Sequence, residues 1–202
     1  MRLHLSSEIV LNKIPEAFYA PKTAVERSEI TRMEKIRTDI FPKVEDGAAN
    51  IADAICKEIK AKSQLGKYCV LGLGTGQSIT PIFQELIQRY ERKEISFKNV
   101  IVFNAYEYFP LKADSPHSAL EQLKTRFLNH VDILEQNVYS LDGTVAQDTV
   151  QEQCRLFEER IQTFGGIDIM LLGIGRIGNI ATNEPGSVIS SSARLILIDA
   201  TS

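Results

Sequence analysis

The chain has 202 residues, of which 44% are hydrophobic and 24% charged, a composition typical of one globular domain and not of a disordered segment. Its formal net charge of −3 argues against a nucleic-acid-binding protein, because contact with the phosphate backbone requires a basic surface. No apolar run approaches the roughly 18 residues of a membrane span, and the amino terminus lacks the apolar stretch of a signal peptide, so we expect a cytoplasmic protein with no membrane partner.

Residues 1–42 are expected to form an extension ahead of the main domain, which we place at 43–202. Pro15, Pro21 and Pro42 interrupt this stretch, and its periodic apolar residues predict an exposed helix over 23–36. Two roles for the extension stay open on the sequence: it lies across the main domain, or it reaches a neighbouring subunit.

From residue 44 onward, apolar runs alternate with stretches of helical periodicity. Helices are predicted where apolar residues recur every three or four positions, at about 44–59, 82–90, 120–128 and 148–164. Strands are predicted at continuous apolar runs, at 68–73, 98–104, 138–141, 167–172 and 194–199. The run at 167–172 is expected to be buried on both faces. Strands separated by helices predict right-handed crossovers, so the fold class is α/β: a three-layer αβα sandwich with a mostly parallel, Rossmann-like sheet.

The cysteines and histidines indicate neither disulfides nor a metal centre. Cys56, Cys69 and Cys154 are widely spaced and include no CxxC pair, so we expect reduced and mostly buried thiols. The three histidines show no metal-ligand spacing. We therefore expect no structural metal and no cofactor.

Two glycine-rich segments follow predicted strands, Leu71–Pro81 (LGLGTGQSITP) and Gly173–Ser187 (GIGRIGNIATNEPGS). In the first segment, the backbone N–H groups of Thr75–Ser78 and nearby hydroxyls would face an anion at the start of a helix. The segment is neither a Walker loop nor a GxGxxG motif, so a phosphate on a small molecule fits better than a nucleotide. A loop with a serine cap and no ligand, or a simple tight turn, is the alternative for each segment.

The segment Phe103–Pro110 (FNAYEYFP) closes the predicted strand at 98–104. Asn104 and Glu107 would lie at the rim of the sheet, where Tyr106 and Tyr108 would form the wall of a pocket. Glu107 as a general base is one interpretation, and a solvated carboxylate on a polar loop is the other.

In order and spacing from Ile40 to Asp199, these segments resemble the glucosamine-6-phosphate deaminase/isomerase family, which is related in fold to the 6-phosphogluconolactonases. The resemblance implies a small-molecule sugar phosphate as ligand, no nucleic acid and a homo-oligomeric assembly. It implies a phosphate and substrate site at Gly74, Thr75, Gly76, Gln77, Ser78, Asn104, Tyr106 and Gly175.

The positions that carry catalysis in the family differ in this chain. The family motif FNxDEY has an aspartate where this chain has Tyr106, and GxGxDGHxAFNEP has an aspartate and a histidine where it has Ile177 and Asn179. Tyrosine is a poor base at neutral pH, isoleucine does not titrate, and asparagine does not carry protons. We predict a sugar-phosphate-binding protein with impaired or altered deaminase chemistry. The alternative is an active isomerase/deaminase in which Glu107 and Glu184 transfer protons and Asn179 orients the ring oxygen.

The family continues beyond the position of Ser202 and brings an arginine and a lysine to the sugar phosphate. Two expectations follow from the resemblance: a truncated domain that belongs to a longer chain with a further carboxyl-terminal domain, or a site that lacks part of its phosphate contacts.

Overall fold

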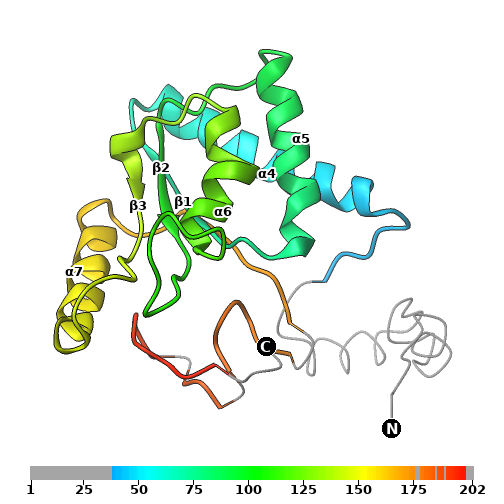
Figure 1. The fold of residues 1–202 in the computed structure, drawn as a ribbon. Coiled ribbons are helices and arrows are strands. Elements are labelled where there is room, and N and C mark those ends of the chain that lie inside the picture. Colours follow the sequence, from blue (N-terminus) through cyan, green and yellow to red (C-terminus); the bar gives the residue numbers. More distant parts are fainter. Residues whose placement is uncertain (1–37, 176–177, 185, 189, 199–202) are drawn as a thin grey trace, which may run out of the picture. The chain divides into compact units, whose positions relative to one another are not determined.

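In a computed structural model of the chain, the described residues are 38–175, 178–184, 186–188 and 190–198 (Figure 1). The chain divides into two compact units, 1–41 and 42–202. The second unit holds the sheet and the helices that cover it. The helix predicted over 23–36 lies outside the described residues.

Four parallel strands form one sheet in the order β3-β2-β1-β4. Their bounds are Cys69–Leu73 for β1, Val100–Asn104 for β2, Val138–Tyr139 for β3 and Ile169–Leu171 for β4. β1 pairs with both β2 and β4, and Leu71 lies opposite Val102 on one side and Ile169 on the other. This arrangement confirms the predicted α/β class and its parallel sheet.

Helices cover both faces of the sheet, α4 (Val44–Gln64), α5 (Thr80–Glu91) and α6 (Ala119–Arg126) on one face and α7 (Val150–Thr163) on the other (Figure 1). Short 3₁₀ turns occupy Gln77–Ile79, Leu128–His130, Glu135–Asn137 and Gln147–Thr149. None of the described helices is both long enough and apolar enough to cross a membrane.

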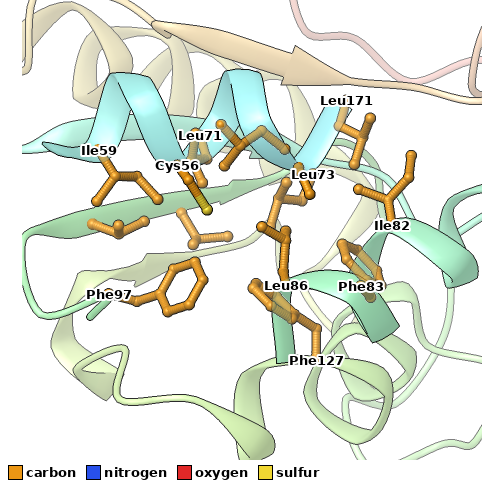
Figure 2. Packing of buried hydrophobic residues seen from close by; sticks show 14 of the residues in the cluster. Cys56, Ile59, Leu71, Leu73, Ile82, Phe83, Leu86, Phe97, Phe127 and Leu171 are labelled. Carbon is orange, nitrogen blue, oxygen red and sulfur yellow. The ribbon is translucent and has the colours of Figure 1, made fainter. Parts of the chain in front are cut away.

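The larger core lies beneath α4, α5 and α6, as Figure 2 shows. Because successive side chains of a strand point to opposite faces, Leu71 and Leu73 enter this core, whereas Val70 faces α7. Phe83 and Phe127 stack in the larger core with ring centroids 4.8 Å apart. The opposite face has a smaller cluster of buried residues, with α7 packed against it.

The structure corrects two expectations beside β4. The run at 167–172 is not buried on both faces, since β4 is an edge strand and Met170 is 45% exposed. The run at 194–199 is not a strand over its described residues 194–198, and Leu197 is 95% exposed. An apolar strand of a parallel sheet needs helices over both of its faces. No helix follows α7 in the described part of the chain, so this run lacks the cover that a strand would require.

The prediction for the cysteines is confirmed, because Cys56, Cys69 and Cys154 are buried free thiols. Burial raises the pKa of all three thiols, and it raises the pKa of Cys69 to about 12. At neutral pH the cysteines therefore behave as small apolar core residues.

Candidate functional site

A cavity of about 630 Å³ opens at the carboxyl ends of β1, β2 and β4, the edge at which α/β sheets usually bind ligands. We call it the carboxyl-edge cavity. Its wall comes from the loops after these three strands and from α6, and it includes residues 74–79, Tyr106, Tyr108, Gln122, Arg126, 173–175 and Asn179.

The two glycine-rich loops predicted from the sequence meet in this cavity. The backbone N–H of Gly74 donates a hydrogen bond to the carbonyl of Leu171 over 2.9 Å, which joins the end of β1 to the end of β4. A Cβ atom on Gly173 would lie 3.0 Å from the Ser78 hydroxyl, a distance too short for easy accommodation. Glycine at position 173 therefore lets the second loop approach the first.

The first loop presents backbone donors in front of α5. Among the described residues, no acceptor takes a hydrogen bond from the N–H groups of residues 75–78, whereas Ile79 donates to the carbonyl of Gly76. These groups lie at the amino-terminal end of the 3₁₀ turn that runs into α5, where the helix dipole favours negative charge. The structure thus brings Gly74, Thr75, Gly76, Gln77 and Ser78 into one cavity wall, and their arrangement can accept an anion.

Tyr106 and Tyr108, from the loop after β2, also line the cavity. The Tyr106 hydroxyl and the Thr75 hydroxyl share a hydrogen bond of 2.8 Å, and Thr75 is only 3% exposed. The two tyrosine rings pack edge to face, with centroids 5.8 Å apart. Burial, reinforced by Tyr106 and Glu107, raises the pKa of Tyr108, so its phenol keeps its proton at neutral pH.

Glu107 does not line the carboxyl-edge cavity. One carboxylate oxygen accepts hydrogen bonds from the backbone N–H groups of Tyr108 and Ala119, over 2.9 and 2.8 Å. The other accepts from the Ser118 hydroxyl and the Leu120 N–H, over 2.8 and 3.0 Å. Four donors thus hold the carboxylate at the amino-terminal end of α6, where it caps the helix.

Asn104 ends β2 and faces a different cavity from the phosphate-binding candidates. It lines a second cavity of about 500 Å³, bounded by β2, α7 and residues 191–198, which shares Tyr106 and Tyr108 with the first. Its side-chain amide donates to the Ser140 hydroxyl over 3.0 Å, and its buried oxygen Oδ1 has no partner among the described residues. Asn104 thus pairs with Leu73 just before the first glycine loop, while its side chain lines the second cavity and not the carboxyl-edge cavity.

Asn179 and Gly175 lie together on the β4 side of the carboxyl-edge cavity. Asn179 is 9% exposed, and its amide donates to the carbonyl of Ala181 over 2.9 Å. A Cβ atom on Gly175 would lie 2.0 Å from the Asn179 side-chain oxygen, so only glycine permits this contact. That oxygen has no hydrogen-bond partner among the described residues.

Two further positions from the sequence motifs, Ile177 and Glu184, are not found among the described residues of the cavity wall. Glu184 is half-buried and is absent from the cavity wall. Ile177 lies outside the described residues. Within the described part of the chain, no group of three or more histidine, cysteine, aspartate or glutamate side chains could hold a metal ion.

Arg126, in the last turn of α6, is a site residue that the sequence did not indicate. Its guanidinium Nη1 donates to the backbone carbonyl of Thr75 over 2.6 Å, and the side chain lines the carboxyl-edge cavity. Arg126 is the only charged side chain among the described residues of the wall, which include no aspartate, glutamate or histidine. No local motif marks this arginine, because its partner lies 51 residues away in the sequence.

Known proteins are similar to this chain over much of its length. Residues 42–196 match the family model described as glucosamine-6-phosphate isomerases/6-phosphogluconolactonase. A Bacteroides thetaiotaomicron protein named as glucosamine-6-phosphate deaminase-like is 52% identical over 98% of this chain and 30% of its own length. The glucosamine-6-phosphate deaminase of Dictyostelium discoideum is 42% identical over 68% of this chain and 51% of its own length. The chain thus spans about a third to a half of these two relatives.

Solved structures share the fold. A structure described as a monomeric glucosamine-6-phosphate deaminase superposes with a TM-score of 0.76 at 29% identity, over 82% of this chain and 66% of that chain. The 6-phosphogluconolactonase of Trypanosoma brucei superposes with a TM-score of 0.61 at 17% identity, over 74% of this chain and 63% of that chain. At that identity the second likeness shows the fold alone.

Proposed function

Because the chain belongs to the glucosamine-6-phosphate isomerase/6-phosphogluconolactonase family, we propose that it binds an amino-sugar phosphate in the carboxyl-edge cavity, with impaired or altered deaminase chemistry. One observation carries the proposal. The described wall of the cavity combines unpaired backbone N–H donors and a guanidinium with no carboxylate and no imidazole. Such a wall suits an anionic ligand and lacks the usual proton-transfer groups.

The first glycine loop is the part of the cavity that supports phosphate binding. The N–H groups of residues 75–78 precede α5, and the Thr75 and Ser78 hydroxyls border the same space. Phosphate oxygens accept charge-assisted hydrogen bonds from donors of this kind, which are stronger than bonds between neutral groups. A sugar phosphate would therefore place its phosphate at this loop and its ring toward Tyr106 and Asn179.

The groups beside the expected sugar ring support impaired chemistry. Interconversion of an aldose and a ketose requires a base that removes a proton from carbon and an acid–base group at the ring oxygen. The Tyr106 hydroxyl is hydrogen-bonded to Thr75, and Asn179 carries an amide that does not act as an acid or a base near neutral pH. Loss of one general base typically lowers a rate by about 10²- to 10⁴-fold.

The alternative, an active enzyme that uses Glu107 and Glu184, has less support. Glu107 would have to give up hydrogen bonds to four donors before it could reach a sugar carbon. Each such bond contributes about 0.5–1.5 kcal/mol, and bonds to a charged group contribute more. Glu184 is absent from the wall of the carboxyl-edge cavity, and Glu107 lines the second cavity instead, which supports the binding interpretation over the enzymatic one.

Calorimetry with glucosamine 6-phosphate, combined with coupled detection of released ammonia in the same sample, tests the proposal. We expect saturable binding without ammonia release at a rate typical of an enzyme, and much weaker binding of glucosamine, which lacks the phosphate. Binding accompanied by rapid ammonia release would support the alternative. The absence of binding by both glucosamine 6-phosphate and inorganic phosphate would contradict the proposed ligand class.

We also propose that the chain acts in the cytoplasm as a homo-oligomer and belongs to a longer protein with a further domain. The three buried free thiols support a reducing compartment. Sedimentation velocity of the purified chain tests the assembly. A monomer at all concentrations would contradict the homo-oligomer, and the structure described as a monomeric deaminase shows that this outcome is compatible with the fold.

A further inference from the structure

The geometry points to Arg126 as the residue that recognises the charge of the bound phosphate, an inference that rests on the proposed function. Arg126 reaches the carboxyl-edge cavity from α6, whereas the other candidate phosphate contacts come from the loop after β1. Backbone N–H groups supply direction and partial charge to such a site, and Arg126 supplies a full positive charge.

The position of the guanidinium supports this role. Its Nη1 lies 2.6 Å from the carbonyl oxygen of Thr75, within the loop whose N–H groups lack acceptors in the described structure. A guanidinium has five N–H donors, and this contact uses only one of them. The remaining donors have no acceptor among the described residues, so a phosphate oxygen at the loop could accept from the guanidinium and from the backbone together.

The charge of Arg126 has no counter-charge in the described part of the chain. Three other arginines, Arg89, Arg92 and Arg155, each form ion pairs with carboxylates. For Arg89 and Arg92, the nitrogen–oxygen distances of the closest pairs lie between 2.6 and 2.8 Å. Arg126 is half-buried, contacts only a neutral carbonyl among the described residues, and borders a cavity without carboxylates. A guanidinium stays charged at any physiological pH, so an anionic ligand is the natural counter-charge for this cavity.

The contact with Thr75 also separates two possible roles of Arg126. If the side chain only tied α6 to the loop, its removal would weaken the fold and the site without regard to the charge of the ligand. If it binds phosphate, its removal lowers affinity most for the doubly charged form. The experiment therefore needs a measurement that depends on ligand charge.

The first measurement is the affinity for glucosamine 6-phosphate and for inorganic phosphate at pH 7.5, determined by calorimetry on the unaltered chain and three variants. We expect Arg126→Gln to weaken both affinities at least about tenfold, and Arg126→Lys to restore part of the loss. Lys124→Gln removes the same charge from the same helix at a position outside the cavity wall, and we expect its affinity to change less than about twofold.

The second measurement repeats the titrations at pH 5.5, since a phosphate monoester takes its second negative charge near pH 6. Affinity of the unaltered chain should rise from pH 5.5 to 7.5, and this rise should be much smaller in Arg126→Gln. An equal loss of affinity at both pH values would assign Arg126 a purely structural role and overturn the inference.

A third measurement uses only the unaltered chain, so it holds even if the variants do not fold. Phenylglyoxal modifies accessible guanidinium groups, and peptide mass spectrometry reads the extent at Arg126. Inorganic phosphate should protect Arg126 and leave Arg92 and Arg155 unprotected. Binding of phosphate without protection of Arg126 would overturn the inference but keep the proposed function, whereas a chain that binds neither ligand would contradict the proposed function itself.

Discussion

Glu107 shows how a single carboxylate can be engaged in the fold at a position where the sequence suggests chemistry. Its oxygens accept hydrogen bonds from four donors. Three are the backbone N–H groups of Tyr108, Ala119 and Leu120, and the fourth is the Ser118 hydroxyl. The side chain thereby joins the loop after β2 to the start of α6. This position argues for a role in the stability of the site and against proton transfer.

Replacement of Glu107 by glutamine tests that role. The amide nitrogen cannot accept hydrogen bonds and would face two donors, so we expect a loss of about 2 kcal/mol in the free energy of unfolding, measured by urea denaturation. Glu121→Gln makes the same change on the same helix at a half-buried side chain whose carboxylate accepts no hydrogen bond among the described residues, and it should cost less than about 0.5 kcal/mol. Ammonia release that disappears in Glu107→Gln while stability is unchanged would instead indicate a catalytic role.

Burial of Cys69 predicts how the stability of the fold changes at alkaline pH. Burial raises the pKa of its thiol to about 12, above the ordinary value, so the folded chain keeps a proton that the unfolded chain loses. The thiol therefore contributes stability that is complete below about pH 9 and decreases as the pH rises toward 12. Unfolding measurements from pH 8 to 11 should show a smaller loss of stability with pH in Cys69→Ala than in the unaltered chain. Parallel curves for the two chains would contradict this assignment.

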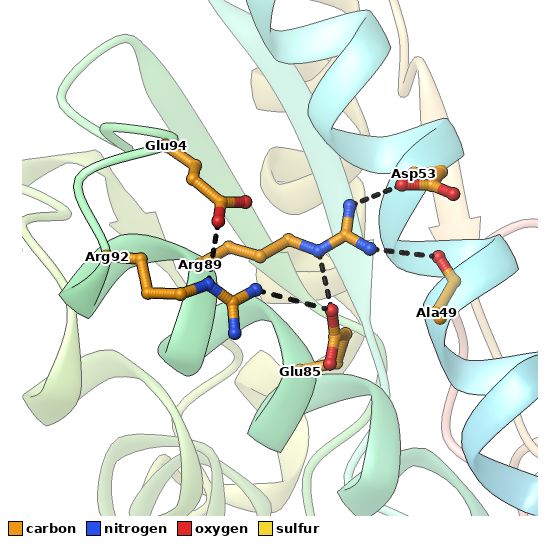
Figure 3. Close-up of polar contacts among 6 residues, drawn as sticks. All are labelled: Ala49, Asp53, Glu85, Arg89, Arg92 and Glu94. Atoms are coloured by element: carbon orange, nitrogen blue, oxygen red, sulfur yellow. Dashed lines mark hydrogen bonds and ion pairs between the residues drawn. The ribbon is translucent and has the colours of Figure 1, made fainter.

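At the scale of elements, α4 and α5 are joined by Arg89, as Figure 3 shows. Its guanidinium contacts Asp53 on α4 over 2.6 Å, the carbonyl of Ala49 over 3.4 Å and Glu85 on its own helix over 2.8 Å. The Arg89 side chain is only 12% exposed, whereas that of its neighbour Arg92 is 51% exposed. Because the Arg89 side chain is mostly buried, its contacts contribute to the packing of α4 on α5. The ion pair between Arg92 and Glu94 is exposed and therefore contributes little.

This difference gives a paired prediction. Arg89→Met should lower the free energy of unfolding by about 1–2 kcal/mol, because it leaves the half-buried Glu85 carboxylate without this partner and removes the link between the helices, whereas Asp53 is 70% exposed and loses little. Arg92→Met should change it by less than about 0.5 kcal/mol, because its ion pair with Glu94 is exposed. Thermal and urea unfolding of both variants provide the comparison, and equal losses would contradict the proposed link.

At the scale of the whole sheet, the two faces have unequal cover. In the part of the chain that the structure describes, three helices and the larger core protect one face, and one helix, α7, packs on the other. Every residue of β1 and β2 is buried, whereas residues 194–198 are irregular and include the exposed Leu197. Stability is therefore expected to vary along the chain, with its maximum at the central strands.

Hydrogen exchange measured by mass spectrometry tests this gradient. Amides of β1 and β2 should exchange slowest, near the rate set by global unfolding, and amides of residues 194–198 should exchange fastest among the described segments. Strong protection of 194–198 would contradict their irregular structure and favour the strand predicted from the sequence.

The sequence predicted the elements whose burial depends on local pattern, and it failed where a distant partner decides. The runs that form β1 and β2 were identified correctly because both faces of each strand meet helices. The run at 194–199 has the same pattern without the same cover. Arg126 and Glu107 could not be assigned, because their partners lie 51 and up to 13 residues away and depend on how the loops fold back.

The hydrogen bond between Gly74 and Leu171 has a further consequence for how this site can change over evolution. It ties the end of β1 to the end of β4, so the spacing of the two glycine loops follows the distance of about 4.8 Å between neighbouring strands. Substitutions at Tyr106 or Asn179 change side chains of the cavity wall and leave this backbone spacing unchanged. The chemistry of the cavity wall and the spacing of its two loops can therefore change independently during evolution.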